Sequence, residues 1–353
     1  MKKKIISLFL SVILVFLLTG CSSESSTGND SEVLNTNSQK KLIKVGFSQV
    51  GAESDWRSAN TESMREVFTA ENGYQLIFED AQQKQTNQIM HIRSFIQQEV
   101  DYIVLAPVTE TGWDTVLQEA KDAGIPVLIV DRMVDVKDDS LYVCWVGSNF
   151  ELEAQKACAF LDAFTIKNGI EAKNINIVDI QGTIGASAQI GRTKGLKDAC
   201  KANGWNLVAV ENGEFTQTKG REVTEALLNK HPEINVIYCE NDNEALGALE
   251  AIESLGRVAG TDIMNGEIMV MSFDGVNREA RQDVIDKKIA CIAECNPLHG
   301  PRVASLIEKI ENGMVPDKMS FVDEEFFSAD YDISSIIAGG NVYPVTFLKE
   351  DSN

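Results

Sequence analysis

Residues 102–131 read YIVLAPVTETGWDTVLQEAKDAGIPVLIVD and place two short apolar runs on either side of one amphipathic segment. The runs at 102–105 and 126–130 are rich in β-branched residues and too short for helices, whereas 113–123 has helical spacing. A strand, a helix and a second strand in this order predict a βαβ unit, whose two strands lie parallel in one sheet.

The same unit recurs on both sides of this stretch. A first series has strands at 43–48, 74–79, 102–105 and 126–130, and helices at 56–71, 85–98 and 113–123. After a strand at 141–146, a second series has strands at 175–180, 207–210, 236–239, 268–273 and 290–294, and helices at 151–167, 188–203, 220–229, 244–255 and 276–287. A chain of 353 residues is long enough for about two domains. The sequence therefore predicts an α/β fold class with two similar, doubly wound parallel-sheet lobes.

The N-terminus has the pattern of a lipoprotein signal peptide. Lys2, Lys3 and Lys4 precede an apolar run that ends in Leu-Thr-Gly before Cys21. Cys21 is the predicted lipidation site, and two acyl chains suffice for stable anchoring. Residues 21–40 are rich in Ser, Asn, Thr and Gly and predict a flexible tether. The alternative is an uncleaved membrane helix. We expect a lipid-anchored protein on the extracytoplasmic face of the cell membrane.

Composition narrows the classes of partner. The chain has 32 Lys and Arg against 53 Asp and Glu, a net charge of −21, which argues against nucleic-acid binding. Hydrophobic residues at 44% and charged residues at 24% are typical of a soluble globular body.

Cysteines and histidines predict no metal site and no disulfide framework. Six cysteines follow Cys21 without a C-x-x-C pair, and we expect most of them to be buried free thiols. The three histidines have no ligand spacing, so no metal is predicted. Because no phosphate-binding loop or EF-hand is present either, no cofactor is predicted.

The residues that follow the predicted strands share one chemistry. In open parallel sheets, ligands bind beyond the carboxyl ends of the strands, where the loops converge. Amides, carboxylates, guanidinium groups and aromatic rings predominate there. The candidate ligand-binding residues are Phe47, Ser48, Trp56, Arg57, Gln83, Pro107, Asp131, Arg132, Thr183, Arg192, Phe215, Asn241, Asp274 and Asn296. Polar groups of these kinds exchange hydrogen bonds with hydroxyls, and aromatic rings cover apolar C–H faces, so the set favours a sugar.

Individual residues in this set have alternative roles. A single Asp after a strand often caps the next helix, which applies to Asp131 and Asp274 taken alone. Arg192 is equally compatible with a solvated helix face.

The same positions carry a resemblance to a known family. The matching segments are VGFSQVG at 45–51, WR at 56–57, QQKQ at 82–85, AP at 106–107, TGW at 111–113, PVLIVDR at 126–132, QGTIGAS at 181–187, GEFT at 213–216, ND at 241–242 and DG at 274–275. These segments resemble the substrate-binding proteins of galactofuranose ABC transporters, which are type 1 periplasmic binding proteins related to ribose- and galactose-binding proteins. The resemblance covers residues 42–325.

The resemblance implies roles for matched residues. It implies that Asp131 and Arg132 grip ring hydroxyls from the N-terminal lobe, and that Arg192, Asn241 and Asp274 do so from the C-terminal lobe. Phe47, Trp56 and Phe215 would stack on the sugar, and Arg57 and Gln83 would complete the N-lobe side. The segment around Glu294 and Asn296 departs from the family pattern, which leaves the choice of sugar open.

By the same analogy the chain crosses between lobes near residues 146, 294 and 325, which forms a three-segment hinge. The N-terminal lobe would contain 41–145 and 295–325, and the C-terminal lobe 146–294 and 326–353. The implied function is delivery of a monosaccharide, galactofuranose or a related hexose or pentose, to an ABC permease subunit. We expect a monomer whose lobes close on the ligand.

Three rival functions belong to other classes. An enzyme is disfavoured, since no histidine lies near a strand end with a Ser or Cys partner and 185–189 is not a nucleophile elbow. A sugar-sensing receptor that acts on a chemoreceptor or sensor kinase uses the same fold and stays open. A cytoplasmic repressor is excluded by the export signal and by the lack of a helix-turn-helix before residue 42.

Overall fold

The computed structural model describes residues 41–350, and within them two β-sheets carry the fold. The first sheet has the order β11-β5-β4-β3-β1-β2, and all of its paired strands are parallel. Its strands are β1 (Ile43–Gln49), β2 (Tyr74–Asp80), β3 (Tyr102–Leu105), β4 (Val127–Val130), β5 (Cys144–Gly147) and β11 (Met319–Phe321).

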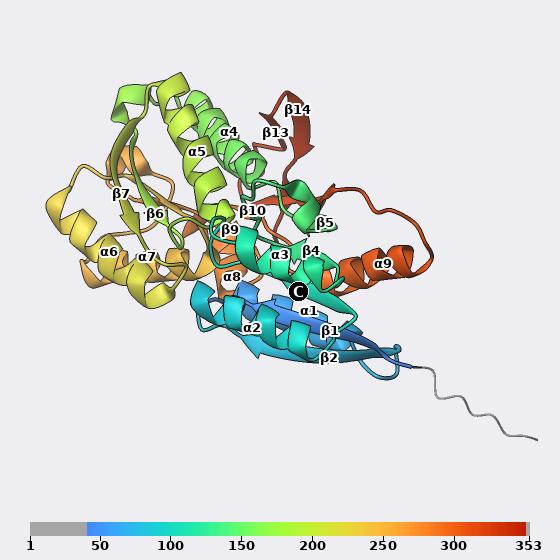
Figure 1. The fold of residues 1–353 in the computed structure, drawn as a ribbon. Helices are drawn as coiled ribbons and strands as arrows, with labels where there is room; N and C mark the ends of the chain where they lie inside the picture. Colours follow the sequence, from blue (N-terminus) through green and yellow to red (C-terminus); the bar gives the residue numbers. More distant parts are fainter. Residues whose placement is uncertain (1–40, 351–353) are drawn as a thin grey trace, which may run out of the picture. The chain divides into compact units, whose positions relative to one another are not determined.

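The second sheet has the order β15-β12-β10-β9-β8-β6-β7. Its strands are β6 (Asn176–Gln181), β7 (Asn206–Asn212), β8 (Val236–Cys239), β9 (Met269–Asp274), β10 (Ile289–Glu294), β12 (Phe326–Ser328) and β15 (Thr346–Phe347). Strands β6 to β10 pair in parallel, whereas β12 runs antiparallel to β10. A separate hairpin of β13 (Ser335–Ala338) and β14 (Asn341–Pro344) packs on α4 (Figure 1).

The helices divide between the two sheets. The first lobe is the first sheet with α1 (Asp55–Val67), α2 (Gln85–Gln97), α3 (Asp114–Asp122) and α9 (His299–Glu311), which packs on α1, β4 and β5. The second lobe is the second sheet with α4 (Phe150–Asn168), α5 (Ser187–Asn203), α6 (Gln217–Lys230), α7 (Asp242–Ser254) and α8 (Arg278–Ile285). Figure 1 shows α1 to α3 around β1 to β4, and α4 to α8 around β6 to β10.

The α/β prediction is confirmed, because apolar strands and amphipathic helices cover each other as their sequence patterns require. β3 and β4 are buried along their whole length, and α3 turns Val116, Leu117 and Ala120 toward them. Both faces of each sheet are covered, which explains why these strands read as continuous apolar runs.

Two predicted regions differ from the structure. The strand expected at 141–146 begins later, at Cys144, because Asp138 accepts a hydrogen bond from the Ser140 backbone N–H and starts a 3-10 turn (Asp139–Leu141). The C-terminal segment, for which no element was predicted, contributes strands β12 and β15 to the second sheet and the β13–β14 hairpin.

The predictions about cysteines and membrane segments have different outcomes. Cys144, Cys158, Cys200, Cys239, Cys291 and Cys295 are all buried free thiols, as expected. Cys21 and the rest of residues 1–40 lie outside the described part of the chain. Within the described residues, no helix combines the length and hydropathy that a membrane span needs.

Candidate ligand-binding site

A small cavity lies between the two lobes, at the carboxyl ends of the parallel strands. Its lining residues are Glu53, Ser54, Trp56, Arg57, Asp131, Arg132, Phe150, Ala188, Arg192, Phe215, Asn241, Asp274 and Cys295. The lining combines charged, amide and aromatic side chains from both lobes. The geometry therefore fits a small polar ligand.

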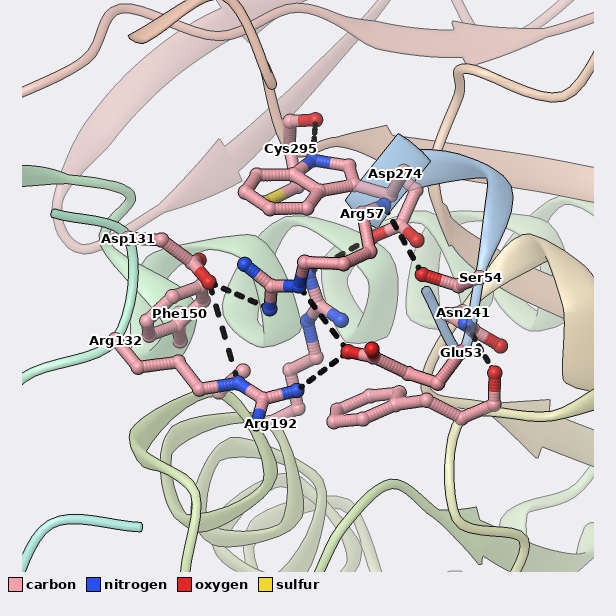
Figure 2. A pocket seen from close by; sticks show the side chains of 13 residues that line it. Glu53, Ser54, Arg57, Asp131, Arg132, Phe150, Arg192, Asn241, Asp274 and Cys295 are labelled. Carbon is pink, nitrogen blue, oxygen red and sulfur yellow. Dashed lines mark hydrogen bonds and ion pairs between the residues drawn. The ribbon is translucent and has the colours of Figure 1, made fainter. Parts of the chain in front are cut away.

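The first lobe contributes a ring of alternating charges. Arg57 Nη2 lies 2.8 Å from Asp131 Oδ2, and Arg57 Nε lies 3.1 Å from Glu53 Oε1. Arg132 closes the ring, with Nη2 3.4 Å from the same Glu53 oxygen and Nε 3.9 Å from Asp131 Oδ2. In Figure 2 both guanidinium groups reach toward Asp131 and Glu53 from different sides. All four side chains are almost fully buried, so the ring is held rigidly beside the cavity.

The backbone around Asp131 is shaped to aim its carboxylate. Asp131 follows β4 with a φ of +60°, a left-handed conformation that non-glycine residues adopt mainly where the surroundings enforce it. Its N–H donates to Val146 O at 2.9 Å, and its carbonyl accepts from Trp145 Nε1 at 3.0 Å. A Cβ on Gly147 would lie 2.5 Å from that carbonyl, so only glycine fits there. Asp131 does not cap a helix, which leaves its carboxylate for the cavity.

The second lobe places one arginine between two acids. Arg192 Nε lies 2.8 Å from Glu153 Oε2, and Arg192 Nη2 lies 3.3 Å from Asp274 Oδ1. Arg192 also donates through Nη1 to the carbonyl of Glu240, and it is 2% exposed. It is therefore a buried, fixed residue of the site and not a solvated helix residue.

Asp274 and Asn241 hold different positions at the ends of β9 and β8. Asp274 has a φ of +87°, and its carbonyl accepts from the Cys295 N–H at 3.1 Å. The N-cap of α8 is Asn277, so Asp274 is not the capping residue of the next helix. Asn241 does cap α7, through Oδ1 to the Glu244 N–H, and its Nδ2 donates to Phe215 O at 3.1 Å.

The rings of Trp56, Phe150 and Phe215 complete the walls. Trp56 donates its indole N–H to Cys295 O at 2.6 Å, and Arg57 lies 4.7 Å from the centroid of its ring. Phe215 has a φ of +60° and packs on Gly182, where a Cβ would lie 1.9 Å from the ring. Arg132 lies 5.3 Å from the centroid of Phe215, so a first-lobe cation contacts a second-lobe ring.

Burial and charge pairing set the protonation of the site. Burial lowers the pKa of Arg57, but the charges of Asp131 and Glu53 outweigh it and raise the pKa overall. Burial and then the neighbouring charge of Arg57 lower the pKa of Arg132 to about 10. Burial raises the pKa of the Asp274 carboxyl well above its usual range, against the effect of Arg192. The guanidinium groups stay charged at neutral pH and can donate hydrogen bonds.

Direct contacts join the lobes at the rim of the cavity. The Asp55 N–H donates to Asn243 Oδ1 at 3.1 Å, and Asp55 Oδ2 accepts from the side chains of Asn243 and Asn277. Elsewhere along the rim, Glu110 N–H donates to Gly185 O at 2.9 Å, and Met133 N–H donates to Ser187 Oγ at 2.8 Å. The structure therefore describes the lobes in contact around the cavity.

Eight of the fourteen candidate residues predicted from sequence line this cavity: Trp56, Arg57, Asp131, Arg132, Arg192, Phe215, Asn241 and Asp274. Six do not: Phe47, Ser48, Gln83, Pro107, Thr183 and Asn296.

Three of those six point into the first lobe. The Phe47 ring lies in the first-lobe core, 5.8 Å from the ring of Phe78. Ser48 Oγ lies 3.0 Å from His91 Nδ1, and Pro107 is buried after β3. Pro107 follows β3 as predicted, whereas Phe47 and Ser48 lie inside β1, and all three side chains face the interior.

The other three make local contacts. Gln83 is exposed, and its backbone N–H donates to Val50 O at 2.7 Å, in the loop that follows β1. Thr183 is half-buried, and its carbonyl accepts from the Ala186 N–H. The Asn296 side chain donates to Glu294 Oε1 and accepts from Arg302 Nη1 and from the Leu298 N–H.

Sequence reasoning missed Glu53, Ser54, Phe150, Ala188 and Cys295. Glu53 and Ser54 lie in the loop before α1, where no pattern singles out one polar residue, although Ser54 caps the helix that positions Arg57. Cys295 directly follows β10, so the strand-end rule that selected Asn296 points equally to it.

Comparisons with known proteins give the site its context. A family model described as a periplasmic binding protein domain matches residues 45–297. The chain is 38% identical over 293 residues to the galactofuranose-binding protein YtfQ of Escherichia coli K12, a match that covers 82% of this chain and 88% of the relative.

Two solved structures agree with this match. A Mycobacterium smegmatis structure in complex with β-D-fucofuranose is 40% identical with a TM-score of 0.76, and the match covers 81% of this chain and 91% of that chain. The second structure is the periplasmic binding protein component of the arabinose ABC transporter of Shewanella sp. ANA-3, bound to α- and β-L-arabinofuranose. It is 36% identical with a TM-score of 0.74, and the match covers 80% of this chain and 91% of that chain.

Both the Escherichia coli relative and the Shewanella protein are named as binding proteins and not as enzymes. This chain belongs to the periplasmic binding protein family and has the type 1 fold of that family.

Proposed function

We propose that this protein binds one monosaccharide in the cavity between its lobes and delivers it to the permease of an ABC importer. The observation that carries the proposal is the set of buried guanidinium and carboxyl groups that face the cavity from both lobes, Arg57, Asp131 and Arg132 opposite Arg192 and Asp274. Charged donors and acceptors in fixed positions recognise the hydroxyl groups of a sugar, and the rings of Trp56 and Phe215 offer surfaces for its C–H groups.

We propose a furanose ring, with galactofuranose as the first candidate. The support comes from the relatives, since one is named for galactofuranose and two solved structures hold fucofuranose or arabinofuranose.

The lobes are proposed to consist of 41–145 with 295–325, and 146–294 with 326–353. Three observations support crossings near 146, 294 and 325. Strand β5 lies in the first sheet and α4 follows it in the second lobe, β10 is followed by α9, and β11 and β12 lie in different sheets. Sugar that contacts both lobes would shift an open ensemble toward the closed form, which the permease would recognise.

We propose that the mature chain is a monomer anchored at the extracytoplasmic face of the membrane through a lipid on Cys21. The basic residues, apolar run and Leu-Thr-Gly-Cys sequence support this. Replacement of Cys21 by Ser is expected to release the protein into the soluble fraction, and retention in washed membranes would contradict the lipid anchor.

The ring form can be tested directly with sugar labelled at C1 with carbon-13. Galactose in water interconverts between pyranose and furanose forms, whose C1 resonances differ. We expect the bound resonance to belong to a furanose, and the sugar to be recovered unchanged after denaturation. A bound pyranose would contradict the furanose assignment, and no bound resonance for any monosaccharide tested would contradict the sugar-binding function.

A further inference from the structure

A group of metal-ligand side chains lies beside the sugar cavity and includes Glu153, the ion-pair partner of Arg192. Glu153 from α4, Cys295 after β10 and Glu324 between β11 and β12 bring one ligand atom each to within 4.8 Å of one another. These residues are far apart in the sequence, so their spacing along the chain gives no sign of the cluster. Exposed acidic groups often gather without a metal, but Glu153 and Cys295 are 1% and 2% exposed.

Glu153 provides a second, independent observation. Its Oε2 is paired with Arg192 Nε at 2.8 Å, whereas its Oε1 is buried and accepts no hydrogen bond. A buried carboxylate oxygen without a partner is unfavourable, because its hydration is lost without replacement. A cation beside Cys295 Sγ and the Glu324 carboxylate would satisfy this oxygen.

The surroundings orient the remaining donors. Ser148 Oγ donates to Glu324 Oε1 at 2.5 Å and lies 3.3 Å from Cys295 Sγ, and the Asn296 N–H donates to the same Glu324 oxygen at 2.8 Å. Such hydrogen bonds to a ligand carboxylate are the usual support of a metal site. Lys156 donates to the backbone carbonyl of Glu324 at 2.8 Å and leaves the carboxylate available.

The donor types select the class of cation. One thiolate and two carboxylates, with a hydroxyl in reach, match Zn²⁺ or Cd²⁺, whereas Mg²⁺ and Ca²⁺ prefer oxygen ligands alone. The cation would take the place of the protons on the thiol and on any protonated carboxyl, and these protons would be released to solvent. Glu324 is half-buried, so the site can be reached from its side.

We propose that Glu153, Cys295 and Glu324 form a binding site for a thiophilic divalent cation at the hinge. Ser148, Cys295 and Glu324 each lie in one of the three segments that connect the two sheets. A cation held by Cys295 and Glu324 would thus tie two of these segments to α4, beside the sugar cavity that Cys295 also lines.

The test is a titration of tag-free, chelator-treated full-length protein with Zn²⁺ by calorimetry and with Cd²⁺ by ultraviolet absorption. We expect one Zn²⁺ per chain, a sulfur-to-cadmium charge-transfer band, and no competition by excess Mg²⁺. In Cys295→Ser the band should disappear and Zn²⁺ should bind about tenfold more weakly or worse, and Glu324→Gln should weaken Zn²⁺ by a similar factor. Cys200→Ser and Cys21→Ser are matched controls and should keep both signals.

Two results would overturn the proposal: no stoichiometric Zn²⁺ binding by the wild-type protein, or a cadmium band that survives in Cys295→Ser. Because the wild-type band is itself a test, the proposal stays falsifiable even if a variant folds poorly. Sugar titrations of the same samples test the proposed transport function separately, so failure of the cation site and failure of sugar binding can be told apart.

Discussion

Asp55 and Asn243 exchange two hydrogen bonds across the rim of the cavity, although they lie in different lobes and 188 residues apart in the sequence. The Asp55 N–H donates to Asn243 Oδ1, and Asn243 Nδ2 donates to Asp55 Oδ2. Asp55 is the first residue of α1 and Asn243 lies in the first turn of α7. Neither residue lines the cavity, so the pair stabilises the contact between the lobes without touching the ligand.

Asp55→Ala is therefore expected to weaken sugar binding about fivefold to tenfold. The substitution removes contacts that exist only in the closed form, so the closed complex is destabilised and the sugar dissociates faster. Stopped-flow dissociation rates test this. Glu62→Ala, which changes an exposed acid on the same helix, is the control and should leave the rate unchanged.

A double-mutant cycle of Asp55→Ala and Asn243→Ala separates this pair from other effects. Asn243→Ala removes both hydrogen bonds, whereas Asp55→Ala removes only the one accepted by Asp55 Oδ2. The two changes should be less than additive, since the loss of that bond is common to both. Additive changes in the dissociation rate would contradict a contact that matters for closure.

Asp131→Asn should weaken sugar binding about tenfold to a hundredfold, because it removes the negative charge that pairs with Arg57 and an acceptor for sugar hydroxyls. Calorimetry gives the affinity, and circular dichroism checks the fold. Glu119→Gln, an exposed acid paired with Arg93 in the same lobe, is a matched control for loss of an ion pair. An affinity equal to that of the wild-type protein would remove Asp131 from the site.

Gly182→Ala is expected to displace the Phe215 ring, which a Cβ at this position would meet at 1.9 Å. Both stability and sugar affinity should fall, as measured by thermal unfolding and calorimetry. In the double variant Gly182→Ala/Phe215→Ala the clash is absent. If the ring is a wall of the sugar site, relief of the clash should restore part of the stability lost in Gly182→Ala but leave affinity low; full recovery of affinity would argue against that role.

His299 gives a pH prediction. It is buried against Trp56, its Nδ1 accepts from Asn60 Nδ2, and burial lowers its pKa from 6.5 to about 4. Below pH 6.5 the unfolded chain binds a proton that the folded chain does not, so the stability tied to neutral His299 is lost as pH falls toward 4. The difference of 6.5 − 4 corresponds to about 3 kcal/mol.

Denaturant unfolding of wild type and His299→Gln between pH 7 and 4 tests this. Several buried carboxyls, such as Asp242 with a pKa of about 6, change stability in the opposite direction over this range. They are common to both proteins, so the difference between the two curves isolates His299. Wild-type stability should fall relative to the variant as pH decreases, and parallel curves would contradict a neutral, buried histidine.

The sequence was sufficient to predict the site residues at those strand ends where the backbone itself directs the side chain into the cavity. Asp131 directly follows β4, Asp274 is the last residue of β9, and both line the cavity. The rule that ligands bind beyond the carboxyl ends of parallel strands predicts the end of the sheet, but it does not predict the direction of each side chain. Phe47 and Ser48 belong to β1 itself, where pleating turns side chains to the two covered faces of the sheet.

Other parts of the site depend on contacts that no local pattern records. Glu53 matters because Arg57 and Arg132 converge on it, and these arginines come from different segments. The C-terminal strands β12 and β15 are short, three and two residues, and are defined by pairing with the second sheet. Short segments of this kind are stabilised by tertiary contact more than by their own propensity.

The most direct test of the central claim is a calorimetric titration of the purified protein with D-galactose, L-arabinose and D-fucose, paired with small-angle X-ray scattering of the same samples. The proposed function predicts one sugar bound per chain, not consumed, with a smaller radius of gyration at saturation because the lobes close on it. If none of a full panel of monosaccharides binds, or a sugar binds at saturation without any change in the radius of gyration, the account of a sugar-closed cavity is contradicted.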